Sequence, residues 1–273
     1  MRVKANGIEL NVDVSGNDGA PCVTLVAGIT NDHTLWDGQV EALSENCRLI
    51  RIDSRGHGLS QSAPAPYALK TIVADIIGVW DALKIGRSVI AGLGLGGVVA
   101  AETALTHPAR VSGVVPISCR ARMVPQYAAL WPPLIEKARA QGLGAIAEAT
   151  LARWFSEEFR AANPDVIARM RTAILKTTLD GYLGCIAALL ELDWADRLAS
   201  FQMQVMYVSG ELDRVGAPPE VMQAMCDATP GSNHMVLPGA THISVVSNPR
   251  AFNEAMLRFL SKLESAANKP GLQ

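Results

Sequence analysis

Short hydrophobic runs of strand length recur along residues 1–118, and segments with helical spacing separate the later ones. The strand-like runs occupy residues 1–5, 8–14, 22–27, 47–53, 88–93 and 111–118. Apolar residues recur with a helical period at 67–83 and 97–106, and Pro108 ends the second of these segments. Strands that alternate with helices in this way predict a mostly parallel sheet with helices on both faces.

A second pattern fills residues 123–200, where nearly every segment has helical spacing. Its breaks are residues that interrupt helices, and they fall at Gly142, Gly144, Asn163-Pro164 and Gly181. The alternation then resumes with two strand-like runs and a closing amphipathic helix, at 204–209, 233–237 and 251–263. We therefore predict an α/β core formed by residues 1–122 and 201–273, with an inserted helical lid at 123–200.

Composition and charge exclude several classes of protein. The chain has 273 residues, of which 49% are hydrophobic and 18% charged, as in a globular protein with a sizeable core. A formal net charge of −2 argues against a basic surface for nucleic acid. The sequence has no run of about 18 apolar residues that would span a membrane and no apolar signal-peptide core near its start. We expect a cytoplasmic protein with no nucleic-acid or membrane partner, and its oligomeric state stays open.

The cysteines predict neither a metal site nor a disulfide framework. Their number is odd, none forms a C-x-x-C pair, and they are widely scattered, at Cys22, Cys47, Cys119, Cys185 and Cys226. We expect free thiols in a reducing compartment. No metal or other cofactor is implied.

The sharpest local feature is the segment 91–97, Ala-Gly-Leu-Gly-Leu-Gly-Gly. It follows a predicted strand and opens a predicted helix. In that context a G-x-S-x-G motif forms a nucleophile elbow, a sharp turn that lifts one side chain above the sheet. Gly92 and Gly96 match the small flanking residues, so Gly94 occupies the nucleophile position, where a serine is expected.

The same glycines also allow a dinucleotide-binding interpretation. Gly92, Gly94 and Gly97 match the G-x-G-x-x-G spacing. That fingerprint expects an acidic residue about 20 residues further on, at the end of the next strand. The run at 111–118 ends without a carboxylate, and the motif lies after several other elements rather than in the first strand–helix unit. We therefore favour the elbow.

Backbone donors for an oxyanion hole are expected at two loops. In a fold with this elbow, one N–H comes from the loop after an early strand, which here points to Ile29. The second comes from the residue after the nucleophile position, Leu95. Together they would hold the negative oxygen that forms when a carbonyl is attacked.

Two polar residues near the end of the chain complete a catalytic constellation. Asp213 follows the strand at 204–209, and His242 follows the strand at 233–237. Nucleophile, Asp, His is the order of the triad in folds with this elbow. There His242 would act as general base and acid, and Asp213 would orient its ring. Taken singly, each is a plausible turn or loop residue, but the set in this order predicts a triad.

These motifs identify a resemblance to the α/β-hydrolase superfamily and, over nearly the whole chain, to 3-oxoadipate enol-lactonases. The similar stretches are residues 25–36, 51–67, 81–85, 153–155 and 240–245. One of them contains the superfamily loop D-x-R-G-H-G-x-S, in which His57 is usually structural. The resemblance implies the α/β-hydrolase fold with a helical lid, hydrolysis of a small-molecule ester or lactone, and no cofactor. It also implies that Trp154, in the lid, faces the substrate, although a place in the lid core is an equal alternative.

Gly94 departs from the family pattern at the residue that carries the covalent chemistry. Glycine has no side chain, so no acyl-enzyme can form there. Cys119 would replace the serine only if it reached the pocket, and a small buried hydrophobe is the simpler interpretation. Two explanations stay open: a deliberate serine-to-glycine change that impairs a hydrolase and traps its ligand, or a natural protein. A natural one would bind a ligand, catalyse a non-hydrolytic reaction, or use His242 and Asp213 on water.

Overall fold

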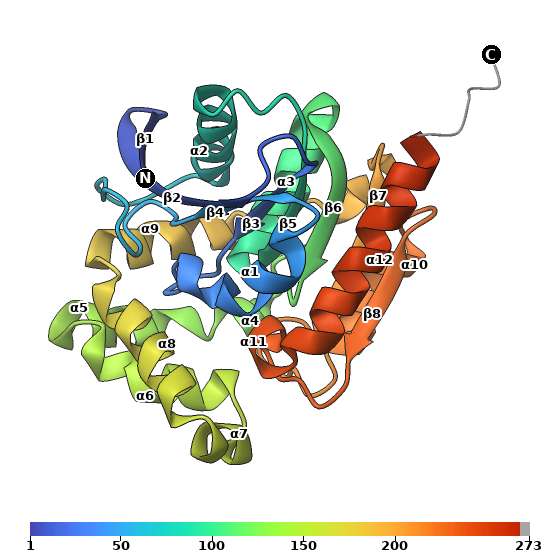
Figure 1. Cartoon of the computed structure of the whole chain (residues 1–273). Helices are drawn as coiled ribbons and strands as arrows, with labels where there is room; N and C mark the ends of the chain where they lie inside the picture. Colours follow the sequence, from blue (N-terminus) through green and yellow to red (C-terminus); the bar gives the residue numbers. More distant parts are fainter. Residues whose placement is uncertain (268–273) are drawn as a thin grey trace.

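An eight-stranded sheet runs through the computed structural model, which describes residues 1–267 (Figure 1). The strand order is β1-β2-β4-β3-β5-β6-β7-β8. β2 pairs antiparallel with β1 and β4, and all other neighbours are parallel. The strands span Arg2–Ala5 (β1), Ile8–Gly16 (β2), Cys22–Val26 (β3), Arg48–Ile52 (β4), Ser88–Leu93 (β5), Val111–Ile117 (β6), Gln204–Gly210 (β7) and Asn233–Leu237 (β8). All eight lie at predicted positions, so the mostly parallel sheet is confirmed.

Helices cover both faces of the sheet, because apolar parallel strands must be buried on both sides. The covering helices are α1 (Asp37–Ser44), α2 (Leu69–Ala82), α3 (Leu95–Thr106), α10 (Pro219–Asp227) and α12 (Pro249–Ala267). On one face α2, α3 and α10 pack into a buried cluster that contains Trp80 and Met222. On the other, α1 and α12 contribute to a second cluster, in which the rings of Trp36 and Phe252 lie 6.1 Å apart. The fold class is therefore that of the α/β prediction.

The segment between β6 and β7 is almost entirely helical, as its spacing predicts. It contains α4 (Pro125–Ala128), α5 (Trp131–Gln141), α6 (Gly144–Trp154), α7 (Glu157–Ala162), α8 (Pro164–Lys176), α9 (Leu179–Leu190) and η3 (Ala195–Ser200). Prolines lie in the first turns of α5 and α8, where no intrahelical hydrogen bond is lost. Helices α5 to α8 lie together to one side of the sheet (Figure 1). The division into a core and a lid at 123–200 stays a prediction.

Helix α9 ties this segment to the core. It packs against α2 and α3, and Cys185 and Ala188 belong to the same buried cluster as Trp80. A Cβ atom added at Gly184 would lie 2.4 Å from the ring of Tyr67. The absence of a side chain at Gly184 is therefore what lets α9 approach the core this closely.

Three further helices are short, and two of the helices that cover the sheet were not predicted from the sequence. The short ones are η1 (His33–Trp36), η2 (Pro108–Arg110) and α11 (Ser244–Ser247). The sequence analysis missed α1 and α10, which have eight and nine residues, too few for a helical period to stand out. It also began α3 two residues late, since the helix starts at Leu95, directly after the turn. Residues 268–273, the end of the predicted core, lie outside the described residues.

Over residues 1–267, no single helix is long and apolar enough to cross a membrane. The pair α8 and α9 passes that test when joined, on length and composition alone, but the two helices are bent by 93° relative to each other.

Candidate active site

The turn between β5 and α3 has the geometry of a nucleophile elbow. Gly94 has φ 58° and ψ −118°, a region that a residue with a Cβ enters only with strain. A Cβ at Gly92 would lie 2.1 Å from the carbonyl oxygen of Gly96. A Cβ at Gly96 would lie 2.1 Å from the carbonyl oxygen of Val26 on β3. Both flanks therefore require glycine, and they let β5, α3 and β3 approach closely enough to hold the turn.

Position 94, the nucleophile position, faces His242, the histidine that the sequence predicts for the triad. Apart from its chain neighbours Leu93 and Leu95, a Cβ at Gly94 would meet one described atom within 4 Å, His242 Nε2 at 3.9 Å. A side chain at position 94 would thus point towards the imidazole. Although φ is positive, the site has room for a small residue.

His242 is oriented by a buried carboxylate. Its Nδ1 lies 3.0 Å from Asp213 Oδ2, and Asp213 Oδ1 accepts the N–H groups of Val215 at 2.8 Å and Gly216 at 3.2 Å. Asp213 is fully buried and His242 is 8% exposed. Burial by itself would raise the pKa of Asp213, but the facing imidazole and these hydrogen bonds outweigh it and hold the pKa below its usual value.

This arrangement fixes the tautomer of the imidazole. An ionised Asp213 only accepts hydrogen bonds, so Nδ1 of His242 donates and Nε2 keeps its lone pair in the neutral ring. That lone pair is on the side of Gly94. A Cβ at Gly216 would lie 2.4 Å from His242 Cε1, so glycine at this position lets the ring lie against the Asp213 loop. The pair has the geometry of a general base.

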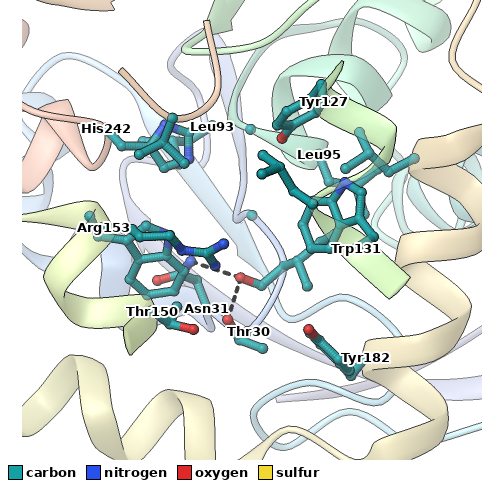
Figure 2. Close-up of a pocket in the computed structure, with 17 residues that line it drawn as sticks. Thr30, Asn31, Leu93, Leu95, Tyr127, Trp131, Thr150, Arg153, Tyr182 and His242 are labelled. Atoms are coloured by element: carbon teal, nitrogen blue, oxygen red, sulfur yellow. Dashed lines mark hydrogen bonds between the residues drawn. The ribbon is translucent and has the colours of Figure 1, made fainter. Parts of the chain in front are cut away.

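Two backbone N–H groups lie beside the same turn. Those of Ile29 and Leu95 donate no hydrogen bond within the described part of the chain, and Leu95 is the first residue of α3, where N–H groups and the helix dipole attract negative charge. The Ile29 carbonyl accepts the Thr30 hydroxyl at 2.7 Å and the Asn31 amide at 3.2 Å, as the dashed lines in Figure 2 show. These bonds hold the loop, in which Thr30 has a positive φ of 60°. Both donors expected for an oxyanion hole are therefore available.

A cavity lined by Gly94 lies between the sheet and the helices of residues 123–200, and Figure 2 shows its lining. All the predicted site residues line this cavity except Asp213, which is buried behind the lining and contacts His242. The lining residues are Gly28, Ile29, Thr30, Asn31, Leu93, Gly94, Leu95, Tyr127, Leu130, Trp131, Thr150, Arg153, Trp154, Tyr182, Leu189, Val215 and His242. Trp154 is 6% exposed, and its carbonyl accepts the hydroxyl of Thr241 at 2.6 Å. This bond joins the end of α6 to the residue before His242.

The sequence analysis missed most of the side chains that residues 123–200 contribute to this cavity. Tyr127, Trp131, Thr150, Arg153 and Tyr182 come from α4, α5, α6 and α9. Helical spacing shows which face of a helix is apolar, but not which residues of different helices meet. The one available signal was the position of Arg153 directly before Trp154 in a stretch that resembles the lactonases.

Two residues that the sequence singled out lie away from the cavity lining. His57 is 1% exposed, and its Nδ1 lies 3.1 Å from the carbonyl oxygen of Arg55, a structural position as expected. Cys119 is 3% exposed, and burial raises the pKa of its thiol. A buried thiol of this kind is a poor nucleophile, so Cys119 does not replace the serine.

A second histidine–aspartate pair was not anticipated. His33 Nδ1 lies 2.9 Å from Asp53 Oδ1, which also accepts the backbone N–H of His33 at 2.6 Å. Asp53 Oδ2 accepts the Asn11 amide at 2.9 Å and the Leu59 N–H at 3.0 Å. None of these residues lines the cavity. Across residues 1–267, no group of three or more His, Cys, Asp and Glu side chains is placed to hold a metal ion.

Comparisons with known proteins agree with this geometry. A family profile for the alpha/beta hydrolase fold matches residues 21–249. The 3-oxoadipate enol-lactonase 2 of Acinetobacter baylyi is 27% identical over 252 residues, which cover 92% of this chain and 93% of that protein. The crystal structure of the enol-lactonase from Burkholderia xenovorans LB400 has a TM-score of 0.91 and 31% identity, covering 96% of this chain and 100% of that one. A thermophilic esterase from Thermogutta terrifontis, solved with malate bound, has a TM-score of 0.90 and 30% identity, covering 96% and 99%.

The fold, the turn at Gly94 and these comparisons agree on one classification. The likeness to 3-oxoadipate enol-lactonases extends over nearly the whole chain, as the sequence motifs indicated. At family level the chemistry is hydrolysis of esters and lactones. The chain belongs to the α/β-hydrolase family and resembles its 3-oxoadipate enol-lactonases.

Proposed function

We propose that this chain carries an ester or lactone hydrolase site of the 3-oxoadipate enol-lactonase type that lacks only its nucleophile. The observation that carries the proposal is that a side chain at position 94 would point towards the imidazole, because its Cβ would lie 3.9 Å from His242 Nε2. Asp213 lies within hydrogen-bond distance of the other ring nitrogen, Nδ1, of this imidazole. The resemblance to enol-lactonases supports a small lactone or ester as the ligand. In this form the cavity binds such a ligand and turns it over poorly.

Each residue has a role in the chemistry of the complete site. A hydroxyl at position 94 would attack the carbonyl carbon, and His242 Nε2 would take the hydroxyl proton and then return it to the leaving oxygen. The N–H groups of Ile29 and Leu95 would hold the oxygen that becomes negative. Trp154 would contact the bound substrate. Glycine supplies no attacking atom, so the acyl-enzyme step is lost while the binding site remains.

The same geometry favours a second, slower activity. Apart from its chain neighbours Leu93 and Leu95, the one described atom within 4 Å of where a Cβ of residue 94 would be is His242 Nε2. A water molecule there would be within reach of the imidazole, which would remove a proton as the water attacks the carbonyl. Sites that keep only such supporting groups retain roughly 10³–10⁴-fold acceleration over water. We therefore expect weak hydrolysis that depends on His242.

The test is the restoration of the nucleophile. Gly94→Ser should raise kcat/KM on an aryl ester and an enol-lactone by roughly 10³–10⁶-fold, and Gly94→Ala should not. Both variants enter the same positive φ, so both should lose about 1 kcal/mol of stability. Gly94→Ala thus controls for backbone strain. A well-folded Gly94→Ser protein that is inert on these substrates and on a wider ester panel would contradict the proposal.

A further inference from the structure

An arginine from another part of the chain holds the loop that carries Asp213. Arg120 follows β6, and its Nε donates a hydrogen bond to the carbonyl oxygen of Gly216 at 2.7 Å. Gly216 donates its own N–H to Asp213 Oδ1 at 3.2 Å. The two backbone polar groups of Gly216 are therefore both bonded, one to the aspartate that orients His242 and the other to Arg120.

Gly216 lies closer to the imidazole than a residue with a side chain could. A Cβ there would lie 2.4 Å from Cε1 and 2.8 Å from Nδ1 of His242, and 2.7 Å from the carbonyl oxygen of Ser118. Glycine is required for this approach, but it gives the backbone more conformational freedom than any other residue. A hydrogen bond from outside the loop restricts that freedom, and Arg120 supplies it.

Arg120 is itself held by its neighbours. The N–H of Ser118, two residues earlier, donates to the Val208 carbonyl on β7 at 2.9 Å, which fixes the end of β6. The guanidinium carbon of Arg120 lies 5.4 Å from the centre of the Tyr127 ring on α4, a distance at which a cation is attracted to an aromatic face. Arg120 therefore connects the sheet and α4 to the Asp213 loop.

The position of this loop sets the direction of the base. Nδ1 of His242 lies 3.0 Å from Asp213, and Nε2 is the atom that a Cβ at position 94 would meet. A loop that moves takes the carboxylate with it, and the ring then turns away from position 94. A misplacement of about 1 Å, even from a change far from the chemistry, can lower a rate by about 10²-fold.

We propose that Arg120 is a positioning residue, whose hydrogen bond to the Gly216 carbonyl keeps the Asp213 loop against the imidazole and Nε2 of His242 directed at position 94. This inference rests on the proposed function, because it adds a residue to the same site. Arg120 lies outside the cavity lining. It therefore acts through Gly216 and not on a ligand.

Two substitutions of similar shape isolate the hydrogen bond. Counted from Cβ, glutamine has an N–H group where arginine has Nε, whereas methionine has a methyl group there. Arg120→Gln thus keeps the donor without the charge, and Arg120→Met loses both. Arg122→Met is the matched control, because Arg122 pairs with Asp193 and Asp196 at 2.9 and 2.8 Å and not with the Asp213 loop. If Arg120→Met does not fold, Arg120→Leu makes the same comparison.

The first readout needs no turnover. Long-range proton–nitrogen NMR spectra of the chain with Gly94 in place show which ring nitrogen of each histidine carries a proton. We expect neutral His242 to carry it on Nδ1 in the unaltered chain, in Arg120→Gln and in Arg122→Met, and to populate both tautomers in Arg120→Met. His33, which has its own aspartate, should keep the same signals in all four proteins and shows that each is folded.

The second readout is kinetic and uses the Gly94→Ser protein. Arg120→Met should lower kcat on p-nitrophenyl acetate by about 10–100-fold and leave KM within about 3-fold, because the base is displaced while the cavity is kept. Arg120→Gln should keep kcat within about 5-fold of the parent value, since its amide can make the same hydrogen bond. Arg122→Met should leave both constants unchanged.

Several results would overturn the inference. A single Nδ1 tautomer of His242 in Arg120→Met, or equal losses of kcat in Arg120→Met and Arg120→Gln, would each do so. An equal loss in Arg122→Met, or a rise in KM alone, would contradict it as well.

The two readouts separate this inference from the proposed function. An inert Gly94→Ser protein, in a chain whose His242 tautomer depends on Arg120, would contradict only the hydrolase assignment. An active Gly94→Ser protein whose kcat is unchanged in Arg120→Met would contradict only the role of Arg120.

Discussion

Two histidine–aspartate pairs lie at the same end of the sheet and have nearly the same geometry. His242 Nδ1 is 3.0 Å from Asp213, and His33 Nδ1 is 2.9 Å from Asp53. Both carboxylate side chains are fully buried, and each follows the end of a parallel strand, β7 or β4. By the distance between histidine and aspartate and the burial of the carboxylate alone, the two pairs are equivalent.

Their surroundings separate them. Asp53 accepts four hydrogen bonds, two of them from backbone N–H groups, so it fixes the loops around it. The side chain of His33 is 21% exposed and lies outside the cavity lining. The second nitrogen of His242 instead faces position 94. What the remaining ring nitrogen faces, rather than the Asp–His distance, therefore distinguishes the pair suited to catalysis from the structural one.

The largest expected difference between the pairs is in activity. In the Gly94→Ser protein, His242→Ala should lower kcat/KM on p-nitrophenyl acetate by roughly 10⁴–10⁶-fold, because no other group takes the serine proton. His33→Ala should change it by less than about 10-fold, since His33 touches no reacting atom. Steady-state kinetics on the three proteins provide the measurement. Similar losses in both variants would remove the distinction between the pairs.

Asp213→Asn tests the same distinction through the carboxylate. In the Gly94→Ser protein this change should lower kcat by about 10⁴-fold, because an amide does not hold the imidazole in the required tautomer. Substrate binding should be little affected, so KM should stay within a few-fold. A change confined to KM would show that Asp213 shapes the cavity and does not support the base.

Asp53→Asn should act on stability instead. The amide nitrogen cannot accept the hydrogen bonds that one Asp53 oxygen now receives, so buried donors lose their partners, at a cost of about 2–4 kcal/mol in unfolding free energy. Urea unfolding of the otherwise unaltered chain measures this cost. An unchanged unfolding midpoint would show that the hydrogen bonds of Asp53 do not hold the loops.

The smallest effect is a pH dependence of stability at His33. The hydrogen bond to Asp53 raises the pKa of His33 above its usual value, against the opposing effect of burial. A raised pKa in the folded state stabilises the fold fully below about pH 6.5, and this contribution is lost as the pH rises through the folded-state pKa. The unfolding free energy of the unaltered chain relative to His33→Asn should therefore decrease over that window. A difference that is flat with pH, or that increases, would contradict the linkage.

Much of the fold was predictable because its signals are local. Buried parallel strands form continuous apolar runs, and the glycines at 92 and 96 mark a close approach that no other residue allows. The order of Gly94, Asp213 and His242 along the chain reflects which strands end at the same edge of the sheet. Short helices such as α1 were not predicted, because so few of their residues are buried.

The side of the site that residues 123–200 form was not predictable in the same way. Arg153 and Tyr127 come from helices whose relative placement depends on tertiary packing, and helical spacing contains no information about it. The sequence analysis missed the pair of His33 and Asp53 for the same reason, since His33 begins η1 and Asp53 follows β4, and the two meet through a side-chain hydrogen bond. A sequence motif predicts the site residues that the turn at Gly94 positions. The site residues that tertiary packing positions are identified only in the structure.

Covalent labelling of the Gly94→Ser protein decides whether the site lacks only its nucleophile. A fluorophosphonate probe reacts with a serine hydroxyl that an adjacent imidazole has activated. Intact mass and peptide mapping should show one adduct per chain, at position 94, in Gly94→Ser, and none in the unaltered chain or in Gly94→Ser combined with His242→Ala. A folded Gly94→Ser protein without an adduct, or stoichiometric labelling of the unaltered chain at another residue, would contradict this account.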